Sequence, residues 1–74
     1  FQNFNLFDHL SVQENITLAL EKALGKSREE ANAIATRLLH HFGLADKATM
    51  YPSDLSGGQK QRLALARTLA LKPK

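Results

Sequence analysis

The 74-residue sequence contains no cysteine. Disulfide bonds and thiolate metal sites are therefore excluded, which is typical of proteins in a reducing compartment. No apolar run approaches the ~18 residues needed to span a bilayer, and no signal-peptide pattern opens the sequence. These absences predict a soluble, cytoplasmic protein. Because the sequence starts at Phe1 rather than at a methionine, we expect it to be a piece of a longer chain.

The formal net charge is small, +3 from 10 Lys and Arg against 7 Asp and Glu. Such an excess is compatible with anionic ligands and is low for a nucleic-acid-binding domain. Glu14, Glu29 and Glu30 fall near predicted helix starts, and Lys72 and Lys74 fall near a predicted helix end. The helix dipole favours both placements, so much of the charge has a structural explanation.

Capping sequences predict the ends of two helices. Residues 11–14 (SVQE) and 27–30 (SREE) are capping boxes, in which a serine hydroxyl and a carboxylate each satisfy a free backbone amide. Gly25 and Gly43 suit the left-handed residue that ends a helix. The apolar residues that repeat at helical spacing are Val12, Ile16, Ala19, Leu20, Ala23 and Leu24 in the first helix and Ala31, Ile34, Ala35, Leu38, Leu39 and Phe42 in the second.

A third helix is expected from Ser56 to about Leu71, closed by Pro73. Residues 1–10 mix aromatic and polar side chains without a clean period, and residues 44–55 are expected to be irregular. The apolar residues predicted on one side of the third helix are Leu63, Ala66, Leu69 and Ala70, with Leu65 near the edge. Because strand-like alternation is absent, the sequence predicts a small all-α unit of about three main helices with an extended N-terminal segment.

Three patterns resemble functional motifs but have simpler interpretations. Residues 25–27 (GKS) resemble the end of a P-loop, yet Leu20 stands where the motif needs its first glycine, and a helix precedes it instead of a strand. Residues 15–17 (NIT) match a glycosylation acceptor but lie inside a predicted helix. His40 and His41 are adjacent, so a helix points them to different faces, and no third ligand stands at the spacing that a metal site needs. We expect no metal site.

The most informative segment is Leu55–Arg62, with the sequence LSGGQKQR. Glycine costs about 1 kcal/mol relative to alanine inside a helix, so a pair of glycines in a first turn does not serve helix stability. Two missing side chains allow a ligand to approach the backbone, and a helix start presents free N–H groups and a partial positive charge. Together these features predict a phosphate site. The alternative is a serine-capped helix with a flexible glycine pair.

Leu-Ser-Gly-Gly-Gln followed by Lys-Gln-Arg resembles the signature motif of ABC ATPases, and residues 63–70 (LALARTLA) continue that family's signature helix. Phe1-Gln2 matches the Q-loop that opens the family's helical subdomain. The resemblance therefore covers residues 1–74, with a Q-loop segment at 1–10 and the signature motif at 55–62. Residues 1–10 and 51–54 (YPSD) are most similar to the branch that imports polar amino acids.

In that family, two ATPase subunits enclose two ATP molecules head to tail. The resemblance implies that Gln2 acts in catalysis on its own subunit's ATP, through Mg²⁺ and the attacking water. The residues that it places against the γ-phosphate held by the second ATPase subunit are Ser56, Gly57 and Gly58, with Gln59 beside them. The P-loop and the Walker B acids are missing from this sequence, so the full-length parent is expected to hydrolyse ATP and the fragment is not.

The resemblance also implies a membrane partner. Residues 3–12 are expected to face the coupling helix of a transmembrane permease subunit, which would place the parent protein at the inner face of the cell membrane. Phe4, Leu6 and Phe7 would supply a hydrophobic surface there. The alternative for each of these three residues is burial in the chain's own core.

Two other functions remain open at this point. A small basic DNA-binding domain could use Gln59, Gln61 and Arg62 to contact bases. A glycine pair loosens such a recognition helix and the net charge is low, so we expect no nucleic-acid partner. A protein-interaction module without any nucleotide role is the second alternative, and it differs in making Ser56 dispensable for ATP hydrolysis.

Overall fold

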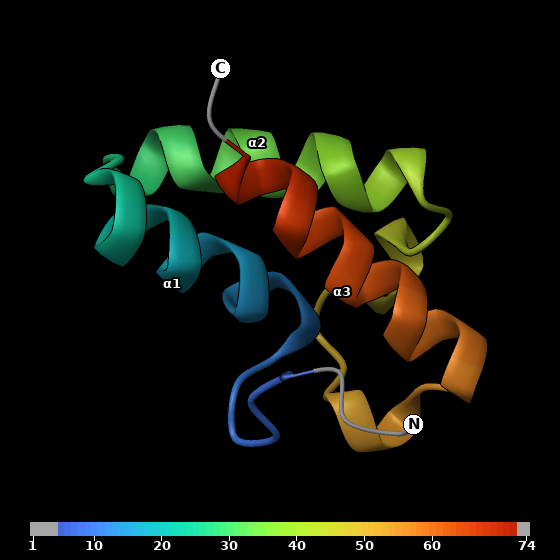
Figure 1. Ribbon diagram of the computed structural model, residues 1–74. Helices are drawn as coiled ribbons and strands as arrows, with labels where there is room; N and C mark the ends of the chain where they lie inside the picture. The colour runs from blue at the N-terminus through green and yellow to red at the C-terminus, as the bar shows by residue number, and fades with distance from the viewer. Residues whose placement is uncertain (1–4, 73–74) are drawn as a thin grey trace.

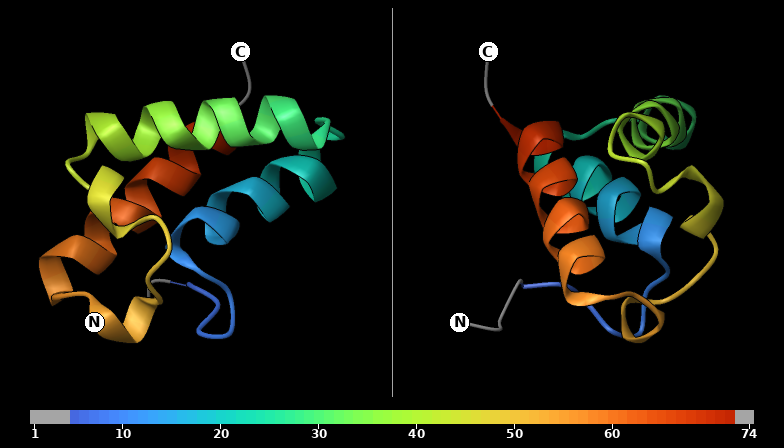
Figure 2. Two further views of the ribbon diagram at one scale, coloured as in Figure 1. Left: turned by 180° about the vertical axis from the view of Figure 1, so that it is seen from behind. Right: turned by 90° about the vertical axis from the view of Figure 1, so that its right-hand side faces the viewer.

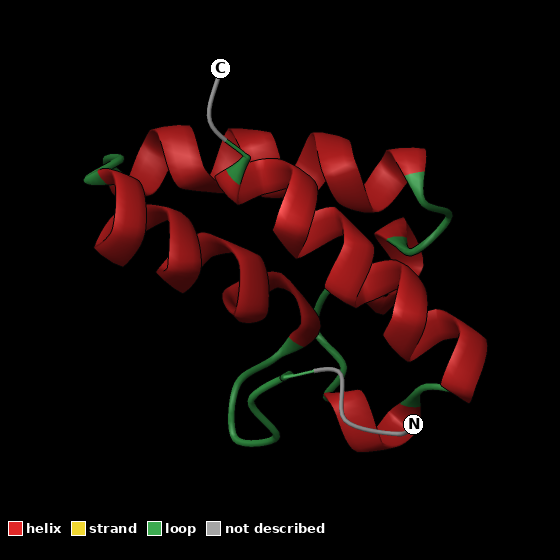
Figure 3. Cartoon of the chain, viewed as in Figure 1, coloured by secondary structure: helices red, strands yellow, loops and turns green. Residues whose placement is uncertain are grey.

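The computed structural model describes residues 5–72, and the regular structure in this range is helical (Figures 1 and 3). The elements in chain order are α1 (Val12–Leu24), α2 (Arg28–His41), the short 3₁₀ helices η1 (Ala45–Lys47) and η2 (Pro52–Asp54), and α3 (Gly57–Leu71). No strand occurs between residues 5 and 72. The predicted all-α fold with three main helices is confirmed. None of these helices is both long and apolar enough to cross a membrane.

The predicted caps position the ends of the first two helices. The hydroxyls of Ser11 and Ser27 accept hydrogen bonds from the amides of Glu14 and Glu30, both at 3.1 Å. Each glutamate in turn accepts a hydrogen bond from the amide of its serine. Gly25 follows α1 with a φ of 67°, the left-handed conformation that ends a helix at little cost for glycine.

Helix α1 packs against both α2 and α3, and the right-hand view of Figure 2 shows it between them (Figures 1 and 2). The connection 44–55, expected to be irregular, contains η1 and η2 and is fixed to the start of α1. The amides of Val12 and Gln13 donate to the carbonyls of Met50, at 2.7 Å, and Ala48, at 3.0 Å. These two bonds satisfy amides that have no acceptor inside α1.

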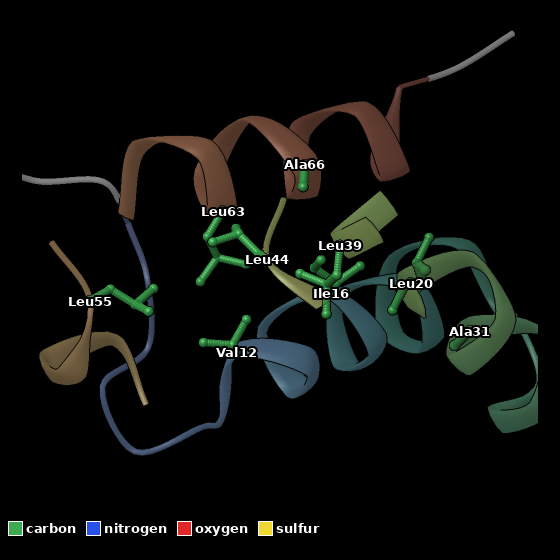
Figure 4. Packing of buried hydrophobic residues seen from close by; sticks show 10 residues of the cluster. Val12, Ile16, Leu20, Ala31, Leu39, Leu44, Leu55, Leu63 and Ala66 are labelled. Carbon is green, nitrogen blue, oxygen red and sulfur yellow. The ribbon is translucent and has the colours of Figure 1, made fainter. Parts of the chain in front are cut away.

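The core brings together buried side chains from all three helices and from the connection between α2 and α3 (Figure 4). The buried apolar residues are Val12, Ile16, Leu20, Ala31, Ala35, Leu39, Leu44, Leu55, Leu63 and Ala66. The predicted apolar faces extend beyond the buried core at two helix ends, where Leu24 is 46% and Leu69 is 48% exposed. Both side chains line an open surface groove where the helices end, so nothing closes over them.

Leu39 is the buried residue that best tests this core. Its side chain is 1% exposed in the middle of the apolar face of α2. We expect Leu39→Ala to lower the free energy of unfolding by ~2–5 kcal/mol, because the deletion loses buried contacts and leaves a cavity. Urea denaturation followed by circular dichroism measures the change. Leu65→Ala, at a side chain that is 50% exposed, is the control and should cost about 0.5 kcal/mol or less. Equal losses in the two variants would contradict the assignment.

Asn15 is a buried polar residue of α1, only 1% exposed, that the helical pattern did not predict. Its Oδ1 accepts a hydrogen bond from the amide of Phe7 at 2.8 Å. Its Nδ2 donates to the carbonyls of Phe7 and Leu10, both at 3.2 Å, and of Ser11 at 2.9 Å. The side-chain amide therefore fixes the non-helical segment before α1, and its burial agrees with discounting residues 15–17 as a glycosylation site.

Removing this amide should release the segment that it holds. We expect Asn15→Ala to cost about 1–3 kcal/mol of stability, because it leaves partly buried backbone groups without partners. The amide of Phe7 should then exchange its hydrogen faster, as measured by NMR. Asn32→Ala is the matched control, since Asn32 makes one exposed hydrogen bond with Gln13. Unchanged exchange at Phe7 in Asn15→Ala would show that other contacts hold the segment.

Candidate functional site

The start of α3, residues 55–59, is called here the α3 tip. The hydroxyl of Ser56 accepts a hydrogen bond from the amide of Gln59 at 3.1 Å. The Gln59 side chain accepts one from the amide of Ser56 at 2.9 Å. This is the same capping box as at α1 and α2, but an uncharged amide replaces the carboxylate. The first turn of α3 therefore carries no acidic side chain.

Gly57 and Gly58 occupy the first two positions of α3. Their amides have no acceptor inside the helix and none among residues 5–72. Neither glycine has a positive φ, and a Cβ added to either would meet no atom within 4 Å. Neither backbone strain nor packing within the described part of the chain requires glycine here. The pair leaves open space above two free N–H groups.

The starts of the other two long helices differ from this tip, although the same serine cap begins each of them. At α1, the corresponding amides of Val12 and Gln13 are occupied by backbone carbonyls. At α2, Glu29 and Glu30 place negative charge in the first turn. Among the three long helices of the described range, α3 alone combines free amides, missing side chains and no acid. Such a helix start can accept an anion.

Two cations follow the tip along α3. Lys60 is partly buried and Arg62 is exposed. Neither forms an ion pair with any residue between 5 and 72. Their charges therefore remain available to a negatively charged ligand at the tip.

Residues 5–10 lie at the same end of the molecule as the α3 tip (Figures 1 and 2). Phe7 is 51% exposed and lines a groove of about 240 Å³ with Leu18, Ala19 and Lys22. Leu6 instead packs partly against the core. Phe7 is therefore exposed, as expected for a partner surface, whereas Leu6 is partly buried against the chain's own core.

Two predicted site residues lie outside the described part of the chain, as do Phe1 of the predicted Q-loop and Pro73 and Lys74 at the predicted end of the third helix. Gln2, the expected catalytic residue, and Phe4, expected at the membrane partner, both precede residue 5. Their assignments stay predictions.

Arg67, in the second half of α3, joins this helix to the segment before α1. It lies on α3, and its guanidinium carbon is 5.5 Å from the centre of the Phe7 ring, within the range of a cation–π contact. Sequence reasoning missed both Arg67 and Asn15. Each is a polar residue in an apolar helix pattern, and that pattern carries no signal of which distant backbone or ring it will contact.

The fold and the tip define the class of this protein as an all-α module with an anion-accepting helix start. A family model described as ABC transporter matches residues 1–74. The chain therefore belongs to the ABC transporter family, as the signature residues predicted.

The chain is similar to ATP-binding proteins of several amino-acid transport systems. It is 50% identical to the glutamate transport ATP-binding protein GluA of Corynebacterium efficiens, over 100% of the chain and 31% of that relative. It is 54% identical to the glutamine transport ATP-binding protein GlnQ of Geobacillus stearothermophilus, again over 100% of the chain and 31% of the relative. It is 55% identical to the L-cystine transport system ATP-binding protein TcyN of Escherichia coli, over 99% of the chain and 29% of that relative. The chain thus spans less than a third of each relative.

The glycine pair offers a direct test of whether the fold itself needs it. We expect Gly58→Ala to raise the free energy of unfolding by up to about 1 kcal/mol, because alanine favours a helix and no neighbour obstructs its Cβ. Urea denaturation measures the change. Gly43→Ala is the control: at a φ of 73° it should destabilise the chain by about 1–2 kcal/mol. A destabilised Gly58→Ala variant would mean that the fold requires this glycine.

Proposed function

We propose that this chain is the helical subdomain of the ATPase subunit of an ABC importer. Residues 1–74 form the subdomain, residues 1–10 its Q-loop and permease-facing segment, and residues 55–62 its signature motif. The observation that carries the proposal is the glycine pair of the α3 tip, which neither the backbone conformation nor the packing of the described residues requires. A requirement from outside these residues explains the pair, and an approaching phosphate is such a requirement.

In this proposal the tip receives the γ-phosphate of ATP bound to a second ATPase subunit. Gly57 and Gly58 supply two free N–H donors and the positive end of the helix dipole. The Ser56 oxygen accepts from Gln59, so the hydroxyl hydrogen remains able to donate to a phosphate oxygen. Gln59 holds the serine in place without bringing negative charge near the phosphate. Lys60 adds positive charge behind the tip.

This arrangement fits the terminal phosphate of ATP in charge and in available space, and its contribution is positioning and electrostatic stabilisation. Bound ATP with Mg²⁺ supplies the phosphoryl group for transfer to water. Hydrolysis further requires a phosphate cradle and magnesium ligands. We propose that these come from other parts of the longer protein, with Gln2 acting on its own subunit's ATP. The chain alone is expected to be inactive and to bind ATP weakly.

The partner at the membrane is proposed to be a transmembrane permease subunit, which would hold the ATPase at the cytoplasmic face. Phe7 lines the groove beside α1 with Leu18 and Ala19, and Lys22 adds a charge at its border. An apolar groove with one cation suits the end of a helix from such a subunit. The relatives named above serve glutamate, glutamine and L-cystine transport. We propose that the transported substrate is a polar amino acid.

Blocking the tip tests the proposal. We expect Ser56→Arg in the full-length ATPase, assembled with its permease in proteoliposomes, to lower ATP hydrolysis by at least about a hundredfold, the scale of losing a transition-state donor. The arginine side chain would occupy the space proposed for the phosphate. Steady-state phosphate release measures the loss.

Ser27→Arg is the matched control, because Ser27 caps α2 with the same hydrogen bonds. Both variants lose about 0.5–2 kcal/mol of capping energy, but only Ser56→Arg obstructs the tip. Ser27→Arg should therefore retain activity in a correctly assembled transporter. Similar rates in the two variants would mean that the tip has no role in hydrolysis, as the alternative of a protein-interaction module requires.

A further inference from the structure

Phe7 contacts two different parts of the molecule. Its ring lines the groove formed with α1, together with Leu18 and Ala19. The same ring lies 5.5 Å below the guanidinium of Arg67, which belongs to α3. Phe7 is therefore shared between the surface proposed to meet the permease and the helix that carries the phosphate-facing tip.

The Arg67 guanidinium depends on this ring. Its Nη1 is buried and has no hydrogen-bond partner among residues 5–72. A buried cationic donor without an acceptor is costly, and the negative face of an aromatic ring offsets part of that cost. Displacement of the ring would leave the charge without this contact. The position of α3 near Arg67 is thus coupled to the position of Phe7.

The backbone of Phe7 cannot move freely either. Its N–H donates to Asn15 Oδ1 at 2.8 Å, and its carbonyl accepts from Asn15 Nδ2 at 3.2 Å. Asn15 is 1% exposed inside α1, so it provides a fixed anchor. Phe7 is consequently held at its backbone by Asn15 of α1 and at its ring by Arg67 of α3.

We propose that Arg67 is a positioning residue that couples occupancy of the Phe7 groove to the placement of the α3 tip. This inference rests on the proposed function. A partner seated in the groove covers the half-exposed ring and excludes water from the Arg67–Phe7 contact. A cation–π contact is weak at an exposed site and becomes stronger when water is excluded from it. Docking thereby holds α3 more firmly, and by linkage a correctly placed α3 favours docking.

The experiment compares ATP hydrolysis by the full-length ATPase alone and assembled with its permease in proteoliposomes. The quantity of interest is the stimulation ratio, the assembled rate divided by the rate of the isolated subunit. A residue that only supports the fold lowers both rates together and leaves this ratio unchanged. The variants are Arg67→Gln, Arg67→Lys, Phe7→Leu and the double variant Phe7→Leu with Arg67→Gln. Arg37→Gln, at an exposed arginine of α2, is the control.

We expect Arg67→Gln and Phe7→Leu each to lower the stimulation ratio about two- to thirtyfold, the range that the loss of one cation–π contact gives. The double variant should fall no further than the single ones, because both remove the same contact. Arg67→Lys, which keeps the cation, should restore most of the ratio. Arg37→Gln should behave as the parent protein.

Several results overturn the inference. An unchanged ratio in Arg67→Gln does so, as do losses that simply add in the double variant. If Arg67→Gln fails to assemble, Phe7→Leu decides, because it replaces a side chain that is already 51% exposed and so disturbs the fold little. An unchanged stimulation ratio in Phe7→Leu would also overturn the inference. Failure of the proposed function is distinguished separately, because Ser56→Arg would then hydrolyse ATP as fast as Ser27→Arg.

Discussion

The first amides of an α-helix have no acceptor within the helix, and the surroundings of these amides differ among the three long helices between residues 5 and 72. At α1, the first two amides donate hydrogen bonds to the carbonyls of Met50 and Ala48, which fixes the connection between α2 and α3. Helix α2 has the exposed acids Glu29 and Glu30 in its first turn. Helix α3 leaves the amides of Gly57 and Gly58 without an acceptor among residues 5–72, so a ligand can accept hydrogen bonds from them.

This difference also organises the rest of the fold. Because the connection 44–55 is hydrogen-bonded to the start of α1, the α3 tip and residues 5–10 lie at one end of the molecule (Figure 2). Asn15 fixes the segment from inside α1, and Arg67 reaches the Phe7 ring from α3. A small core can hold these parts together since α1 packs against both other helices. The proposed phosphate site and the proposed docking groove are therefore joined by ordinary packing and hydrogen bonds.

Local signals in the sequence predicted most of the fold. Serine caps and terminal glycines act within a few residues, so the ends of α1, α2 and α3 could be placed closely. Helical spacing identified the apolar faces but not how far neighbours cover them, which is why Leu24 and Leu69 belong to these faces and are still about half exposed. The glycine pair at Gly57 and Gly58 indicated a phosphate site, since its cost to the helix has no local compensation. The opposite exposures of Leu6 and Phe7 could not be predicted, because adjacent apolar residues in a loop have no period.

By itself, the sequence determined the family, the helical class and the serine cap and glycine pair of the α3 tip, because each depends on residues close together in the chain. Only the tertiary structure decided that Asn15 would hold the backbone of Phe7 and that Arg67 would lie over its ring. These contacts join residues 8 and 60 positions apart, and their partners follow from how α1 and α3 pack. Side-chain hydrogen bonds and ring contacts have ranges of a few ångströms, so they exist only after the hydrophobic core has brought the helices together.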